Sequence, residues 1–230
     1  MKVLQEKLDF LLDKYSVGKK AVLKDRNTVT VDGKEIPLLA HRAERRFIEL
    51  RNIAHNGTLT GISVMRSARI VQKGECLNAA LYRELDICAF VLQEGFVSIF
   101  SIANGNTMNT IAKTESGIVC TIEISAAMGA GQLVVDKHEI ISQRGTACDK
   151  VVDTQNMQSS IYVFGKSEQQ YTDVDFELYG LEIPDVAVVR QAFAVAFKNI
   201  ADELVAADKL ACEWVAKSDE SLKTCRKVGA

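Results

Sequence analysis

The chain has 230 residues, of which 47% are hydrophobic and 25% charged, and its formal net charge is −2. This composition is typical of a soluble globular protein and fits one large domain, or a domain with a small appendage. No block of basic residues stands out, which argues against nucleic acid as a partner. No apolar run approaches the ~20 residues that span a bilayer, and the charged N-terminus does not resemble a signal peptide. Six scattered cysteines without a CxxC pair favour buried thiols in a reducing cytoplasm.

The first part of the chain, residues 1–40, reads as an N-terminal helix and a short hairpin, either a remnant or an appendage. Residues 2–14 carry leucines at helical spacing, and a short strand follows at residues 20–23. The pair Asp32-Gly33 between two apolar stretches predicts a hairpin over residues 28–38. Helical spacing returns from residue 39 to His55, and Asn56-Gly57 closes that helix.

The middle of the chain predicts a sheet. A strand is expected at residues 61–71, followed by a helix from Gly74 to about Leu92 that Gly95 ends, and then by another strand. Alternating apolar residues predict further strands at 117–125, 138–143, 159–164 and 171–178. These strands follow one another without intervening helices, so we expect a largely antiparallel sheet.

The C-terminal part predicts the helices that cover this sheet. The apolar residues of one long helix fall three or four apart: Val186, Val189, Phe193, Phe197, Ile200 and Leu204. A last helical segment is expected near residues 206–217, with Trp214. The predicted fold class is therefore α+β, an open and largely antiparallel sheet with helices packed on one face. We assign residues 41–230 to this domain.

Several polar clusters in the sequence are candidate sites. The three histidines do not cluster, and His138 beside Asp136 and Glu139 does not have the spacing of a metal site, so we predict no metal. Two further clusters remain open. Asp173, Asp175 and Glu177 are either a cation site or, more simply, a solvated strand face. The arginines Arg42, Arg45, Arg46 and Arg51 either bind an anion or form exposed ion pairs with nearby glutamates.

Phosphate-binding loops have no signature in this sequence. No GxGxxG or GxxxxGK[ST] motif follows a strand, and residues 104–107 and 128–131 read as turns. Because these motifs are missing, we predict no cofactor.

The stretch from Lys137 to Gly145, followed by residues 146–153, is more polar than a sheet requires and is a candidate lining for a cleft, with His138 and Arg144 as its candidate ligand-binding residues.

The order of elements and several motifs resemble the C-terminal domain of the glucose–fructose oxidoreductase/inositol dehydrogenase (Gfo/Idh/MocA) family. Three passages carry the resemblance: Arg42 followed by Gly57–Gly61, the strand Gly117–Ser125, and the strand and turn His138–Gly145. Members of that family place a Rossmann domain before this α+β domain. The chain begins too late to hold that unit, so the resemblance implies a protein that lacks the Rossmann domain.

The family's catalytic positions differ in this sequence. The family's helix motif is Gly-Gly-x-x-x-Asp-x-Gly-x-His-x-x-Asp, and Gly74 and Asp86 match its ends. The position of its aspartate is Ala79, and the position of its histidine is Arg83. In a passage that resembles the family's Glu-Lys-Pro motif, the corresponding residues are Lys24 and Asp25. A methyl group cannot transfer a proton, and an arginine is no general base near neutral pH, so we expect no catalytic residue here.

The resemblance therefore implies a non-catalytic, oxidoreductase-like protein that acts in association or ligand binding and is not an active dehydrogenase on its own. The alternative is a subunit of a sugar or polyol oxidoreductase whose NAD(P) site is supplied by a partner chain; a small-molecule sensor is compatible with either. Candidate residues for a small anionic or sugar-like ligand are Arg83, Lys24, Arg26, His138 and Arg144. Arg83 has an alternative role, an ion pair with Glu84, Glu75 or Asp86.

Family members commonly pair through the exposed face of this sheet, so the resemblance also implies a homo- or hetero-oligomer. Val119 and Thr121 on one strand, with Tyr162 and Phe164 on another, make that face too apolar to leave in water.

Overall fold

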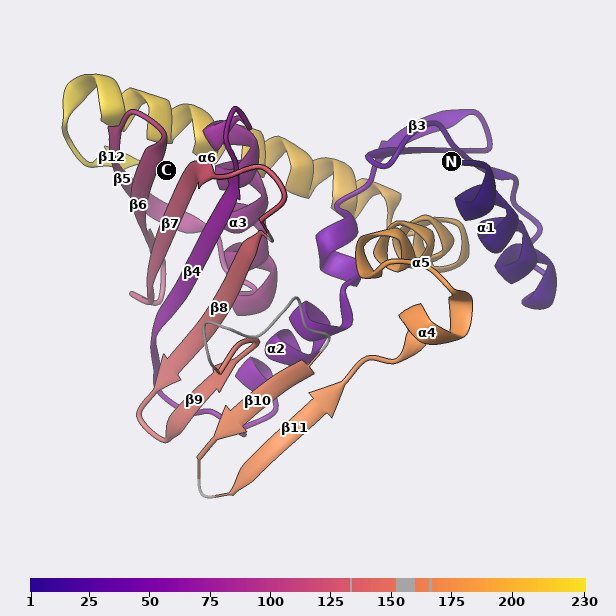
Figure 1. Cartoon of the computed structure of the whole chain (residues 1–230), viewed down its shortest axis with the longest axis horizontal. Coiled ribbons are helices and arrows are strands. Elements are labelled where there is room, and N and C mark those ends of the chain that lie inside the picture. The colour runs from indigo at the N-terminus through magenta and orange to yellow at the C-terminus, as the bar shows by residue number, and fades with distance from the viewer. Residues whose placement is uncertain (133, 152–159, 166) are drawn as a thin grey trace. The chain divides into compact units, whose positions relative to one another are not determined.

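The computed structural model describes residues 1–132, 134–151, 160–165 and 167–230 (Figure 1). Residues 152 and 153 of the predicted polar stretch, and residue 159 of a predicted strand, lie outside this part. The described chain forms two compact units. The first contains residues 1–48 and 173–210, and the second contains residues 49–172 and 211–230.

The first unit combines helices with a small sheet. Its elements are α1 (Lys2–Lys14), β1 (Ala21–Leu23), β2 (Thr28–Val31), β3 (Lys34–Pro37), the 3-10 helix η1 (Ala40–Ala43), the start of α2 (Arg45–His55), α4 (Asp175–Tyr179), α5 (Ile183–Lys198) and the start of α6 (Ala201–Thr224). The three strands pair in the order β1-β2-β3. The predicted Asp32-Gly33 hairpin is confirmed, and both residues have positive φ, as the turn requires.

The second unit is built on a sheet of nine strands. They are β4 (Ile62–Gln72), β5 (Phe96–Asn104), β6 (Thr107–Thr114), β7 (Val119–Met128), β8 (Val135–Ser142), β9 (Gly145–Cys148), β10 (Ser160–Phe164), β11 (Glu168–Thr172) and β12 (Val228–Gly229). Their order is β11-β10-β9-β8-β4-β7-β6-β5-β12. Among the described residues every neighbouring pair is antiparallel except β4 and β7, which are parallel.

Helices cover one face of this sheet (Figure 1). The central one is α3 (Leu77–Leu92), whose buried side includes Leu81, Leu85 and Cys88. Residues 211–224 of α6 lie on the same face, because Trp214 packs against Phe96 of β5. The predicted fold class, an α+β protein with an open and largely antiparallel sheet, is confirmed. None of the helices in the described residues combines the length and the hydrophobicity that crossing a bilayer requires.

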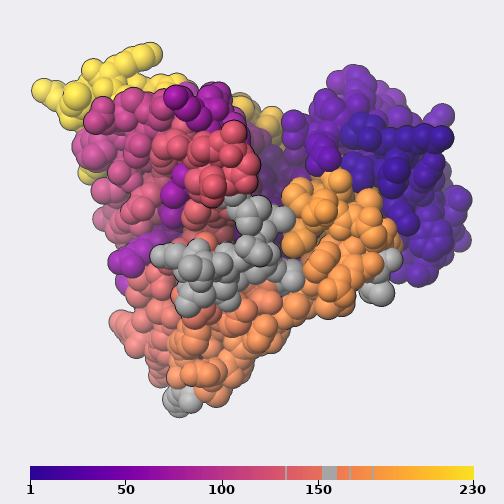
Figure 2. Space-filling view, in the orientation of Figure 1, coloured from indigo at the N-terminus to yellow at the C-terminus, as the bar shows by residue number. Residues whose placement is uncertain are grey.

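The opposite side of the sheet, toward the viewer in Figure 1, is called the open face below. Register places two rows of residues on it: Phe100, Ile111, Thr121, Arg66, Glu139, Cys148, Tyr162 and Gln170 in one, and Lys113, Val119, Val64, Ile141, Thr146, Phe164 and Glu168 in the next. Val119, Thr121, Tyr162 and Phe164 therefore share one face of the sheet. Figure 2 shows β5, β6 and β7 at the surface in the same orientation.

Some predicted elements were wrong. The predicted strand at residues 171–178 is instead the end of β11 followed by α4, which begins with two acidic residues in its first turn and ends at Gly180 with positive φ. The predicted long C-terminal helix is divided by Asn199, whose left-handed backbone ends α5. The helix expected at residues 39–55 is divided by the extended residue Glu44. Strands β6, β9 and β12 were not predicted.

The role expected for the helix from Val186 to Leu204 also needs correction. We expected it to cover the sheet, but α5 belongs to the first unit, where Phe193 lies 5.4 Å from the ring of Tyr15 at the end of α1. Its buried apolar residues, such as Val186 and Val189, pack within that unit, where α1, η1 and the small sheet are the neighbouring elements, whereas Phe197 is exposed. The sheet's cover comes from α3 and from residues 211–224 of α6 instead.

Candidate functional site

His138 occupies a fully buried position of β8. The strand alternates between the two faces of the sheet, so His138 and Ile140 both point toward the helices and both are 0% exposed. The neighbouring strand β4 places Ser67 directly beside His138. A buried imidazole is stable only if both of its ring nitrogens have hydrogen-bond partners, and charged side chains supply them here.

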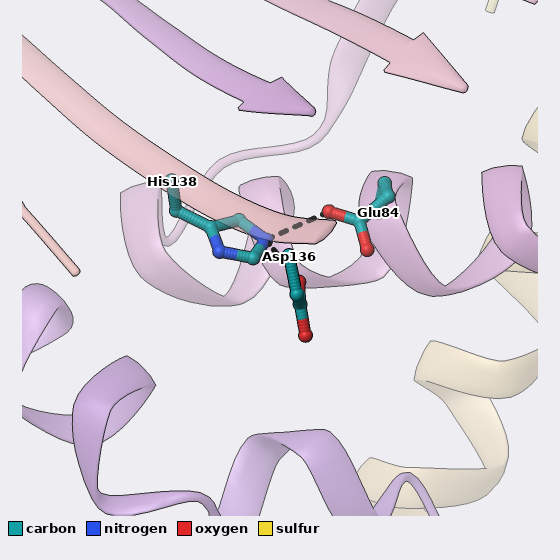
Figure 3. A group of neighbouring side chains, drawn as sticks. All are labelled: Glu84, Asp136 and His138. Carbon is teal, nitrogen blue, oxygen red and sulfur yellow. Dashed lines mark hydrogen bonds and ion pairs between the residues drawn. The ribbon is translucent and has the colours of Figure 1, made fainter. Parts of the chain in front are cut away.

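Glu84 approaches His138 from α3 (Figure 3). It lies three residues after Leu81 and four before Cys88, so helical geometry places it on the buried, apolar side of α3. Its Oε2 accepts a hydrogen bond from His138 Nε2 at 2.8 Å and another from the hydroxyl of Ser67. Glu84 is 0% exposed, so these bonds replace the water that a carboxylate would otherwise bind.

Asp149, directly after β9, holds the other side of the histidine ring. His138 Nδ1 lies 2.7 Å from Asp149 Oδ2, and the backbone N–H of His138 donates to Asp149 Oδ1 at 2.7 Å. The backbone N–H of Asp149 in turn donates to the carbonyl of His138 at 3.1 Å. Glu84, His138 and Asp149, called the His138 network below, thus join α3, β8 and the segment after β9.

The charges in this network stabilise one another. Burial by itself disfavours an imidazolium, but the carboxylates of Asp149 and Glu84 outweigh burial and raise the pKa of His138 to about 9. Burial likewise disfavours the carboxylate of Glu84, but the charges of His138 and Arg83 outweigh it and lower its pKa to about 2. At neutral pH the network therefore holds a charged histidine between two charged carboxylates.

Arg83 and Asp136 are two further charged side chains next to the His138 network, and both are slightly exposed. Arg83 Nη1 lies 2.5 Å from Glu84 Oε1, and its two terminal nitrogens donate to Asp136 at 3.2 and 3.1 Å. Arg69 of β4 also pairs with Asp136, at 3.2 Å. Three carboxylates, two guanidinium groups and one imidazolium thus contact one another in this group. Of the two roles considered for Arg83, the geometry shows the ion pair with Glu84.

A metal ion is the main alternative use of these groups. Ligand atoms of Glu84, Asp136 and His138 lie within 4.8 Å of one another, and Asp149 orients the histidine ring as second-shell carboxylates do in metal sites. However, a divalent ion would have to displace the proton of His138 and the contacts that Arg83 makes with Glu84 and Asp136. The donor set therefore fits an ion-pair network better than a metal centre.

A proton-transferring role for His138 also fits poorly. Both ring nitrogens are engaged by carboxylates and the side chain is 0% exposed, whereas a general base needs an unoccupied nitrogen within reach of substrate. Ala79, at the position of the family's aspartate, is exposed on α3 one turn before Arg83. The geometry of the His138 network is that of a structural cross-link.

The remaining predicted ligand-binding residues lie elsewhere. Lys24 pairs with Glu35, and Arg26 lies 2.5 Å from Asp185, all within the first unit. Arg144 is exposed in the turn between β8 and β9. The structure brings together Arg83 and His138, both of which touch Glu84, and it does not bring Arg144 into that group. Whether these residues bind a ligand remains a prediction.

Two further predicted clusters form ion pairs. Arg190 of α5 makes a bidentate contact with Asp173, at 2.7 and 2.9 Å, and also bonds Asp175, so these acids contact an arginine within the first unit. Arg46 pairs with Glu44 at 2.7 Å, and Arg42 lies 3.7 Å from Glu203. The solvated strand face expected for the acidic residues is wrong, because Asp173 is 8% exposed and Asp175 begins helix α4. For the arginines, ion pairs with glutamates describe the contacts of Arg42 and Arg46, although Arg46 is buried and not exposed.

Neither the contact of Asp149 with His138 nor that of Glu84 with His138 was predicted from the sequence. One signal for Glu84 was available, since a glutamate within the apolar stripe of a helix requires a buried partner. Asp149 carries no comparable signal, because its burial depends on the pairing of β9 with β8.

Comparison with known proteins supports the fold. No protein-family model and no curated protein sequence matches this chain. Solved structures do: an oxidoreductase from Pseudomonas syringae (TM-score 0.66, 11% identity), an inositol dehydrogenase homolog from Azotobacter vinelandii complexed with NADH and myo-inositol (0.63, 11%), and levoglucosan dehydrogenase in complex with NADH and levoglucosan (0.65, 12%). They cover 83%, 84% and 83% of this chain, which in turn spans 63%, 63% and 64% of theirs. At such identities the likeness establishes the fold, and the predicted resemblance is confirmed at that level: this chain has the fold of Gfo/Idh/MocA-type oxidoreductases.

Proposed function

We propose that this chain is a non-catalytic relative of these oxidoreductases that acts by associating with another protein chain through the open face of its sheet. The observation that carries the proposal is the row of apolar residues on that face. Val119, Val64 and Ile141 follow one another across three adjacent strands, and Phe164 continues the row one strand beyond Thr146. Contiguous apolar surface of this kind marks interaction sites in soluble proteins.

The charges around this row favour a specific partner. Arg66 lies 3.6 Å from Glu139 on the open face, and Lys113 and Glu123 are exposed nearby. Ile111 is 48% exposed and Phe164 is 37% exposed among them. An apolar centre with charges of both signs around it is suited to a self-complementary homodimer or to a partner with the same fold.

The cross-link at His138 supports the non-catalytic part of the proposal. In this chain the groups around α3 are engaged with one another: Arg83 with Glu84 and Asp136, and His138 with Glu84 and Asp149. An anionic or sugar-like ligand at Arg83 would have to compete with two carboxylates. Association therefore has stronger support than ligand binding.

Light scattering coupled to size exclusion tests the association. We expect the wild-type chain to exceed its monomer mass of 25.3 kDa, and Val119→Lys to return it to that mass by placing a charge in the apolar row. Val22→Lys is the matched control, because Val22 is a partly exposed strand valine of the other sheet. A wild-type monomer at high concentration contradicts a homo-oligomer. If no other protein co-purifies with the chain from its source, a hetero-oligomer is contradicted as well.

A second candidate is a subunit of a sugar or polyol oxidoreductase whose NAD(P) site lies on a partner chain. Two of the structural neighbours are complexes with NADH, and this chain spans 63% and 64% of their length. We expect the isolated chain to bind neither NAD nor NADP in titration calorimetry, since no dinucleotide-binding glycine motif is present. Micromolar binding by the isolated chain contradicts this expectation, and binding only after a co-purifying partner is added supports the second candidate.

The altered catalytic positions give a separate test. The double variant Ala79→Asp/Arg83→His restores the residue types of the family's motif on α3. We expect it to show no turnover of myo-inositol with added NAD, because the isolated chain holds no hydride carrier. Turnover by this variant without a partner chain contradicts the non-catalytic proposal, and turnover by the wild type contradicts it more directly.

A further inference from the structure

The sequence contains two Asn-Gly pairs, Asn56-Gly57 and Asn104-Gly105, and their surroundings differ. In such a pair the backbone nitrogen of the glycine can attack the side-chain carboxamide of the asparagine, because glycine has no side chain to obstruct the approach. Both asparagines are exposed, so water reaches both of them. Local hydrogen bonding therefore decides which pair reacts more readily.

Asn56 follows α2 directly and belongs to no helix or strand. Its side-chain Oδ1 accepts a hydrogen bond from the backbone N–H of Thr58 at 2.9 Å, so the carboxamide folds back along the chain in an Asx turn. Gly57 has φ +85°, and a side chain added there would meet nothing within 4 Å. The turn therefore keeps the carboxamide beside the peptide bond whose nitrogen would attack it, in an open loop.

Asn104 is the last residue of β5 and lies opposite Thr107 of β6. Gly105, with φ +59°, begins the turn between these two strands. Rotation of the Asn104 backbone toward a geometry for attack would break this last pair of the ladder. Within the described part of the chain no hydrogen-bond donor reaches the side-chain oxygen of Asn104. This second pair therefore serves as an internal reference for the first.

We propose that Asn56 is a site of spontaneous deamidation, with Gly57 as the nucleophile and the N–H of Thr58 as the group that stabilises the developing negative charge. The Gly57 nitrogen loses its proton to water and forms a bond with Cγ of Asn56, and the C–N bond of the carboxamide breaks and releases ammonia. Water then opens the resulting cyclic succinimide at either carbonyl, which gives aspartate or isoaspartate. The net reaction consumes water and releases ammonia, and no oxidant or cofactor takes part.

The hydrogen bond from Thr58 is placed where charge develops during the reaction. In the tetrahedral intermediate the negative charge lies on Oδ1 of Asn56, the atom to which Thr58 already donates. A hydrogen bond to a charged oxygen is stronger than one to a neutral oxygen, so this contact strengthens along the reaction and lowers the barrier. We expect Asn56 to react about tenfold faster than Asn104, which corresponds to about 1.4 kcal/mol of barrier.

The products change the end of α2. A carboxylate at residue 56 places negative charge next to the last carbonyl groups of the helix, where negative charge is unfavourable. Isoaspartate also lengthens the backbone between residues 56 and 57 and removes the Asx turn. This reaction takes place within one chain, so it does not depend on the association proposed above.

Peptide mapping by mass spectrometry follows both Asn-Gly pairs in the same sample of full-length chain. Deamidation raises the mass of a peptide by about 1 Da, and fragment spectra locate the changed residue. During incubation at pH 7.4 and 37 °C, we expect Asn56 to be converted about tenfold faster than Asn104. In concentrated urea the two rates should come within about twofold of each other, because both pairs then lose their folded surroundings.

Two variants test the role of the N–H group directly. Thr58→Pro removes this donor and should slow the conversion of Asn56 about tenfold. Thr58→Ala keeps the N–H and is the matched control, with a rate within about twofold of wild type. Circular dichroism checks that each variant is folded; if Thr58→Pro does not fold, the comparison with Asn104 in buffer and in urea still decides. The inference is overturned if Asn104 reacts as fast as Asn56 in the folded chain, if the difference persists in urea, or if folded Thr58→Pro keeps the wild-type rate.

Discussion

Each unit of this protein holds a cationic side chain between two carboxylates, and the two arrangements differ in burial. In the second unit His138 lies between Glu84 and Asp149, and all three are 0% exposed. In the first unit Arg190 lies between Asp173 and Asp175, where the side chain of Arg190 is 22% exposed and that of Asp175 is 41% exposed. The charges are alike, but only one of the two groups is sealed from water.

The difference shows how burial changes what an ion pair contributes. Near the surface, water screens the attraction and also solvates a charge whose partner is removed. In the interior, an ion pair adds little stability over an apolar replacement. Removal of one partner, however, leaves the other charged group buried without water or a counter-charge. The His138 network also joins β8 to α3, with His138 and Glu84 54 residues apart, whereas Arg190 joins α5 to acids only 17 and 15 residues before it. We therefore expect the His138 network to be the more sensitive to substitution.

The largest expected effect comes from breaking each arrangement at one group. Glu84→Ala should lower the free energy of unfolding by about 3–5 kcal/mol, because it leaves buried partners unpaired. Arg190→Ala should cost about 2 kcal/mol, since it leaves only Asp173 buried while Asp175, whose side chain is 41% exposed, stays solvated. Urea unfolding at pH 7 measures both. Equal losses would contradict the role assigned to burial.

The pH dependence distinguishes histidine from arginine. The pKa of His138 is about 9 in the folded protein, against an ordinary value of 6.5, so its contribution is fully present below pH 6.5 and is lost as the pH rises through 9. The pKa of Glu84 is lowered from 4.5 to about 2, so its contribution is present above pH 4.5 and is lost as the pH falls toward 2.

Between pH 6 and pH 9.5 we thus expect a loss on the order of 3 kcal/mol in wild type. Urea titrations at the two pH values measure it. His138→Gln should remove most of this dependence, and Arg190→Gln should leave it in place, because arginine stays charged throughout. A wild-type stability that is flat over this range would contradict a charged His138.

The smallest effects should appear within the first unit. Burial disfavours the charged form of Asp173, but its hydrogen bonds and charge interaction with Arg190 outweigh burial and lower the pKa of Asp173. Asp173→Asn should therefore cost about 1–2 kcal/mol, and the more exposed Asp175→Asn at most about 1 kcal/mol. Thermal unfolding of the two variants shows which substitution destabilises the protein more. A larger loss at Asp175 would show that exposure does not order these contacts.

Several elements followed from local sequence because local physics forms them. The leucine spacing of α1 and α3 and the Asp32-Gly33 turn depend on residues within a few positions of one another. The errors occurred where local signals were ambiguous. Residues 171–178 alternate in polarity as a strand does, yet acidic residues in the first turn and a left-handed Gly180 give a short helix. Similarly, β9 has only four residues, too few to show an alternating pattern that would distinguish it from a turn.

The sequence alone determined the fold class and an open sheet with helices on one face, and it predicted Arg83 and His138 as candidate positions. Tertiary structure decided their partners. Glu84 and His138 are 54 residues apart and His138 and Asp149 are 11 apart. These pairs form only after β8 has paired with β4 and β9 and α3 has packed on the sheet. Burial in that assembled core, which no local pattern specifies, joins these side chains in an ion-paired cross-link.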